Sequence, residues 1–64
     1  MRVVTIDVSA RTVLAACNRC SHRDLELSRP AALRAAAAHQ AQAHSDPDAA
    51  ARCRELATRS ETRP

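Results

Sequence analysis

The spacing of its cysteines and histidines constrains this chain more than any other feature. Cys17 and Cys20 are separated by two residues, His39 and His44 are separated by four, and eighteen residues lie between the two pairs. Two thiols and two imidazoles in such an order are typical of a zinc site, because Zn²⁺ takes four sulfur or nitrogen ligands in a tetrahedron. The pattern predicts one structural Zn²⁺ ion bound by these four residues. The gap exceeds the usual ~12–15 residues, so two unrelated thiols and two solvent-facing histidines are the alternative.

The size and composition of the chain also favour a bound metal. It has 64 residues and no Phe, Tyr or Trp, and its large aliphatic residues are five Leu, four Val and one Ile. Alanine supplies fifteen of the apolar residues, and each alanine buries little surface. A chain this short needs a metal, disulfides or a partner to supplement its core.

Three short segments have the character of β-strands. Residues 2–8 are rich in β-branched side chains and alternate, which predicts a strand. A connection over residues 9–11 leads to a second strand, 12–16, that runs into Cys17. Residues 22–27 form a third candidate, with Leu25 and Leu27 on one face. Together they predict a small antiparallel sheet, or a hairpin preceded by an extra strand.

Two helices are expected after the strands. Residues 30–44 consist of strong helix formers, and Ser28 and Pro30 are a typical helix start. Ser45 and Asp46 end this helix. Asp46 then caps a second helix over 46–59, which leaves 60–64 as a frayed tail. Residues 1–59 are expected to form one module.

The two histidines do not share a face of an ideal helix. His39 and His44 lie about 140° apart at ~100° per residue, so binding one ion requires the helix end to distort. In the alternative, only His39 binds and His44 is solvated at the helix C-terminus. His22 is a competing ligand because it follows Cys20 by two residues. Cys53 falls on the apolar stripe of the second helix, where we expect a buried thiol, and it is an alternative to His44 as a ligand.

The order of these elements resembles a known zinc-binding family. Cys17, Cys20, His39 and His44, with strands before them and a helix carrying the histidines, resemble a ββα zinc finger of the two-cysteine, two-histidine type. The resemblance covers residues 12–44, and the layout is also similar to short zinc-finger-like proteins of GC-rich bacteria and their phages. It implies a small α+β fold, a zinc-stabilised finger with an extra N-terminal strand and a second C-terminal helix. Leu25 or Leu27 would replace the core aromatic residue of such fingers.

The charge of the chain suggests nucleic acid as a partner. The net charge is +3, and all ten basic residues are arginine, a count to which GC-rich codon usage contributes. Fingers of this type read bases from helix positions that are Ala32, Ala35 and Ala38 here, and alanine forms no hydrogen bond with a base edge. We therefore expect an accessory or regulatory binding module that contacts phosphates with low base specificity. The arginines expected to do so are Arg19, Arg23, Arg29 and Arg34.

The alternative function is a zinc-stabilised protein-protein interaction module that binds no nucleic acid. Its surface would be the alanine-lined face of residues 31–43 or the exposed edge of the first strand. The acidic residues show no paired arrangement that suggests acid–base chemistry, no nucleophile has a base, and there is no glycine for a phosphate loop, so we expect neither an enzyme nor a small-molecule substrate. No apolar stretch is long enough for a signal peptide or a membrane span, and we expect a cytoplasmic protein with reduced thiols.

Overall fold

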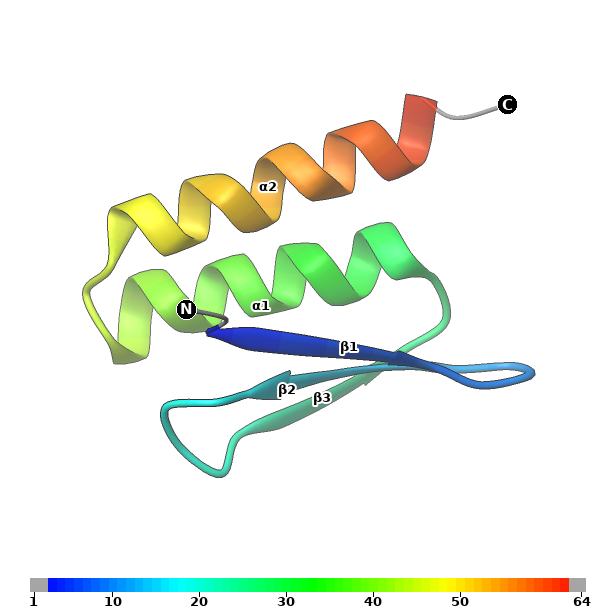
Figure 1. Cartoon of the computed structure of the whole chain (residues 1–64), viewed down its shortest axis with the longest axis horizontal. Helices are drawn as coiled ribbons and strands as arrows, with labels where there is room; N and C mark the ends of the chain where they lie inside the picture. Colours follow the sequence, from blue (N-terminus) through cyan, green and yellow to red (C-terminus); the bar gives the residue numbers. More distant parts are fainter. Residues whose placement is uncertain (1–2, 63–64) are drawn as a thin grey trace.

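Three antiparallel strands are followed by two helices in this protein (Figure 1). The structure is a computed structural model that describes residues 3–62. The strands are β1 (Val4–Val8), β2 (Val13–Cys17) and β3 (Arg23–Glu26), and the helices are α1 (Arg29–Ala43) and α2 (Pro47–Thr62). The small α+β fold is confirmed, and so are the extra N-terminal strand and the second C-terminal helix.

The elements form three layers. The strand order is β1-β2-β3, and α1 lies between this sheet and α2 (Figure 1). Within the described residues, α2 packs against α1 and against none of the strands. The central strand β2 turns Val13, Ala15 and Cys17 toward α1, where all three are buried. This alternation follows from the two-residue period of a strand.

Alanine shapes the packing of α1. The helix starts as the sequence predicts, with the Ala31 amide donating to Ser28 Oγ at 3.3 Å and Pro30 in the first turn. Ala32, Ala36 and Ala37 are buried among the strands and α2. Small side chains let two helices approach closely, so much of the alanine face proposed as an interaction surface packs inside the protein instead. The described residues of α2 that are buried are Ala49, Ala50, Cys53 and Ala57.

The prediction that Leu25 or Leu27 completes the core is wrong. Leu25 is 65% exposed and Leu27 is 85% exposed. The register explains the difference, because Glu26 lies opposite Val13 and Asp24 lies opposite Ala15. Paired residues share a face, so the inward face of β3 carries the two half-buried acids and its leucines point to the open face of the sheet. Leu33 of α1, only 2% exposed, is the large core side chain.

The second helix is longer than the sequence analysis predicts. It continues through Thr62 rather than ending at Arg59. Ion pairs hold this last turn: Arg59 contacts Glu55 within α2 at 2.9 Å, and Arg34 of α1 contacts Glu61. Residues 63 and 64 of the expected tail lie outside the described residues. Within residues 3–62, neither helix combines the length and the apolar character that crossing a membrane requires.

Candidate metal centre

Two thiols are presented by the loop that joins β2 to β3. We call residues 17–20 the knuckle. The amide of Cys17 donates to the carbonyl of His22 at 3.0 Å, which closes this loop. The amide of Asn18 donates to the carbonyl of Val3 at 2.9 Å, which fastens the knuckle to the start of β1. The backbone therefore fixes both sulfurs at one end of the sheet, facing α1.

The two histidines come from the C-terminal end of α1, where the helix is distorted. The amide of Asp46 donates to the carbonyl of Gln40 at 3.0 Å, a span of six residues where an α-helix spans four. Ser45 has φ 48°, in the left-handed region that often ends a helix. His44, the last half-helical residue, has φ −116° instead of the helical value of about −63°, and this rotates its side chain away from the direction it would have in an ideal helix. The distortion required by the sequence argument is present.

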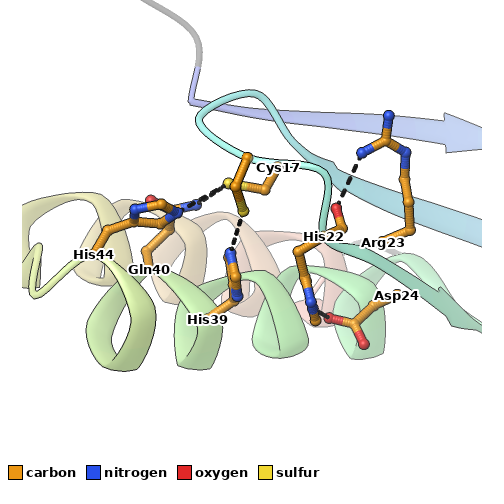
Figure 2. Close-up of polar contacts among 8 residues, drawn as sticks. Cys17, His22, Arg23, Asp24, His39, Gln40 and His44 are labelled. Atoms are coloured by element: carbon orange, nitrogen blue, oxygen red, sulfur yellow. Dashed lines mark hydrogen bonds and ion pairs between the residues drawn. The ribbon is translucent and has the colours of Figure 1, made fainter.

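The four predicted ligands come together around one point. Their donor atoms all lie within 4.8 Å of one another. Cys17 Sγ is 3.4 Å from His44 Nε2, and Cys20 Sγ is 3.2 Å from His39 Nε2. Zn–S and Zn–N bonds in a regular tetrahedron would place sulfur and nitrogen about 3.6 Å apart. Figure 2 shows both imidazoles reaching from α1 toward the knuckle, so these residues can hold one metal ion.

The surroundings of Cys17 favour its thiolate, which is the form that binds metals. Burial acts to raise the pKa of this thiol. Hydrogen bonds from the Arg19 backbone and from the side chains of Gln40, Cys20 and His44 outweigh burial and lower the pKa from 9.0 to about 6. The sulfur that is most deeply placed in the site is thus prepared to carry negative charge.

Gln40 is a functional residue that the sequence analysis missed. It is 0% exposed, and its Nε2 donates to Cys17 Sγ at 3.3 Å (Figure 2). Its Oε1 is buried and has no hydrogen-bond partner among residues 3–62. Positions 33, 37 and 40 lie on one buried stripe of α1. The available signal was that this stripe is apolar at Leu33 and Ala37 but polar at Gln40.

His22 does not belong to the group of four ligands. Its Nε2 lies 2.8 Å from Asp24 Oδ2, and its ring stacks on that of His39 with centroids 3.9 Å apart and an interplanar angle of 6°. The stacked ring restricts how His39 can turn, and the carboxylate restricts His22 in the same way. We interpret His22 as a residue that orients His39.

Cys53 also lies outside the group of ligands. It is buried on α2, as predicted, and burial raises the pKa of its thiol. Cys53 therefore stays protonated at neutral pH and packs as a small apolar residue among alanines.

The loop between the helices is tied to the knuckle by Asp46. Its Oδ1 accepts from the Ala49 amide at 3.0 Å, which caps α2, and its Oδ2 binds Arg19 at 2.7 Å. The hydrogen bond from the Ala49 amide lowers the pKa of Asp46 the most, and the contact with Arg19 lowers it further. The sequence predicted the cap but not the ion pair, because nothing in the sequence places Arg19 next to this loop.

The four arginines predicted to contact nucleic acid have different surroundings. Arg19 is paired with Asp46, and Arg34 is paired with Glu61. Arg23 donates to the carbonyl of His22 at 3.2 Å. Arg29 lines a groove between β1 and α2. Two of the four charges are therefore already neutralised by carboxylates of the same chain.

Comparison of the chain with protein-family models, with curated proteins and with solved structures found no match. The metal centre is therefore inferred from its own donor atoms. Within the part of the chain that the structure describes, no other group of cysteines, histidines and acids has this arrangement.

Proposed function

We propose that this protein is a small binding module stabilised by one structural Zn²⁺ ion, and that it is not an enzyme. The observation that carries the proposal is the convergence of two thiols and two imidazoles within 4.8 Å. Four protein ligands complete the tetrahedron of zinc, whereas a catalytic zinc keeps one position open for water or substrate. The ligand set is closed, so its role is to hold the fold.

The proposed ion joins two ends of the fold that are also connected by the Arg19–Asp46 ion pair and the hydrogen bond from Gln40 to Cys17. Cys17 and His44 are 27 residues apart in sequence, and the ion would fasten the end of the sheet to the end of α1. The largest fully buried side chains are Leu33 and Gln40, so the core is poor in large apolar groups. Structural zinc contributes ~10–16 kcal/mol in zinc-finger peptides, more than the ~3–5 kcal/mol that a core of this size supplies.

Metal analysis with and without chelator tests this proposal. We expect one Zn²⁺ per chain, and we expect chelation to remove the helical circular-dichroism signal because folding and binding are one event. Cooperative thermal unfolding retained after chelation would show that the metal is not needed for the fold.

The ligand types support zinc as the proposed metal. Thiolate and imidazole in a tetrahedral arrangement favour zinc, whereas magnesium and calcium prefer oxygen ligands. Titration with Zn²⁺ and Mg²⁺ should therefore show binding of zinc alone. Thiolate ligands also need a reducing compartment, which is consistent with the proposed cytoplasmic location.

Nucleic acid is a candidate partner of this binding module. Arg23 and Arg29 are exposed and form no ion pair within the described residues, so they are free to contact phosphates with little base specificity. Two phosphate contacts predict that log affinity falls with log salt with a slope of about −2. Arg23→Ala and Arg29→Ala should each reduce that slope by about one, whereas Arg34→Ala, which removes an ion-paired arginine, should change it less. Absence of binding to duplex DNA and RNA at ~50 mM salt would rule this partner out.

A further inference from the structure

Within residues 3–62, the first strand has one edge to which no other strand is bonded. In that part of the chain β1 pairs only with β2, and hydrogen bonds from Asn18 N to Val3 O and from Ser9 N to Thr12 O flank the ladder. In an antiparallel ladder, alternate residues bond to the partner strand. Residues 3, 5, 7 and 9 therefore face β2, and the backbone groups of Val4, Ile6 and Val8 point outward.

The partner strand supports this assignment. Cys17 lies opposite Val4, yet its amide donates to His22 on the far side rather than to β1. The outward N–H and C=O groups of β1 thus form a row that matches the backbone of an added strand. β1 contains no proline, so every outward residue of this strand keeps the backbone N–H group that such pairing requires.

A groove lies directly beside this edge. It has a volume of about 590 Å³ and runs between β1 and α2. Figure 1 shows α1 between β1 below it and α2 above it. Side chains of Val4, Ile6, Leu33, Cys53 and Leu56 give the groove its apolar surface. The backbone of α2 does not come close to any strand within the described residues, which leaves the groove open between α2 and β1.

The charges along the groove are unequal. Its lining includes three arginines and two aspartates, which give a net charge of +1. They are Arg19, Arg29, Arg52, Asp46 and Asp48. Arg19 is paired with Asp46. Arg29 and Arg52 have no ion pair within residues 3–62, so the groove offers two free guanidinium groups to a carboxylate.

We propose that an extended segment of a partner protein binds here as a fourth strand paired with β1. Its alternate apolar side chains fill the groove, and an acidic residue binds Arg52. This inference rests on the proposed role as a binding module, and it names the chemistry of the partner. A nucleic acid has no backbone that matches the row of amides and carbonyls on β1, and its phosphates would not occupy the apolar part of the groove.

Selection from short random peptides displayed on phage tests the proposal. With the zinc-loaded protein as target, we expect enriched peptides to alternate apolar and other residues and to carry an acid. The amide resonances of Val4, Ile6 and Val8 should shift when the best synthetic peptide is added. N-methylation of a peptide amide that faces β1 should weaken binding about fivefold, because one backbone hydrogen bond is lost, whereas methylation of the next amide should not.

A matched pair of variants tests the charge. Arg52→Glu should weaken binding of the selected peptide at least about tenfold, because a favourable charge contact becomes repulsive. Arg54→Glu makes the same charge change two residues away on α2, outside the lining of the groove, and should leave the affinity nearly unchanged. Zinc content and circular dichroism of both variants separate loss of binding from loss of the fold or failure of the zinc proposal.

Several results would overturn the inference. Equal effects of the two charge variants would mean that no acid of the peptide binds Arg52 in the groove. Equal effects of methylating either amide would mean that the peptide does not pair with β1. A zinc-loaded protein that dimerises in sedimentation, with the same three amides shifted, would identify a second copy of the chain as the occupant. Selection that yields no alternating acidic peptides, together with shifts of these amides on adding duplex DNA, would favour nucleic acid.

Discussion

Two regions of this protein each bury a cysteine, and the pKa values of the two thiols are shifted in opposite directions. Cys17 lies in the knuckle end of the sheet and Cys53 lies between the helices, and each is 5% exposed. The pKa of Cys17 is lowered to about 6, whereas burial raises the pKa of Cys53. Equal exposure therefore does not give equal chemistry.

The neighbours of each sulfur explain the contrast. Cys17 accepts hydrogen bonds from Gln40 and from the Arg19 backbone, and it lies 3.4 Å from His44 Nε2. Cys53 packs among apolar residues that include Ala50 and Ala36, which donate no side-chain hydrogen bond. One region stabilises a thiolate for a metal, and the other excludes charge and fills space between helices.

The largest effect should come from exchanging sulfur for oxygen in the two regions. Cys17→Ser should abolish binding of one Zn²⁺ and with it the folded state, since neutral serine is a poor zinc ligand and the metal supplies most of the stability. Cys53→Ser should keep one Zn²⁺ per chain and lose only ~1–3 kcal/mol, the cost of burying an unpaired hydroxyl. Metal analysis and circular dichroism measure both.

The reverse result would overturn the assignment of the ligands. If Cys53→Ser loses the metal and Cys17→Ser keeps it, then Cys53 is the ligand. Equal zinc affinity in both variants would place the metal elsewhere.

The next largest effect concerns the hydrogen bond to Cys17. Gln40→Leu removes the donor to the sulfur and should weaken zinc binding by about 10–100-fold, the usual cost of losing a group that supports a ligand. Gln42→Leu, an exposed position two residues along the same helix, is the control and should leave zinc affinity unchanged. Competition with a chelator of known affinity gives both values. Equal affinities in the two variants would show that Gln40 is only a filler of the core.

The regions differ in how far the sequence predicts them. The spacing of the cysteines and histidines predicted the group of candidate metal ligands, because the ligands of one ion follow a spacing that can be recognised in the sequence. Cys17, Cys20, His39 and His44 do come together in the structure. The strong helix formers of α1 likewise predicted that helix. The expectation for Cys53 also held, because an apolar stripe at helical spacing marks a buried face.

Facts that depend on how segments meet were not predictable in this way. Pairing with β2 determines which face of β3 turns inward. The sequence of β3 alone favoured its leucines as the inward-facing residues. Gln40 reaches Cys17 across 23 positions, and Arg19 reaches Asp46 across 27. Neither contact leaves a local signal, since glutamine and arginine are ordinary helix and loop residues.

A smaller effect is expected from truncating the apolar cysteine. Cys53→Ala removes one buried sulfur and should lower the free energy of unfolding by ~1 kcal/mol through the small cavity left between the helices. The zinc content should remain one per chain. Thermal unfolding of the zinc-loaded variant measures the change, and a loss of several kcal/mol would mean that Cys53 does more than fill space.

The smallest effect is a dependence on alkaline pH that should be specific to Cys53. Burial raises the pKa of this thiol above the unfolded value of 9.0, so the folded state keeps its proton where the unfolded chain has lost it. The stability that this provides is fully present below about pH 9 and declines as the pH rises through the folded pKa. The difference in unfolding free energy between the unmodified chain and Cys53→Ala should therefore be constant below about pH 9 and shrink above it.

The composition makes this small effect measurable. The chain has no lysine and no tyrosine, so few other groups titrate in the same range. In the zinc-bound protein the proposed ligands Cys17 and Cys20 are already thiolates, and they contribute no further deprotonation in the folded state. Any deprotonation of Cys17 and Cys20 in the unfolded state is the same in the unmodified chain and in Cys53→Ala. It therefore cancels in the difference between their unfolding free energies. A difference that stays constant well above pH 9 would show that burial does not keep Cys53 neutral, and the contrast between the two cysteines would then rest on Cys17 alone.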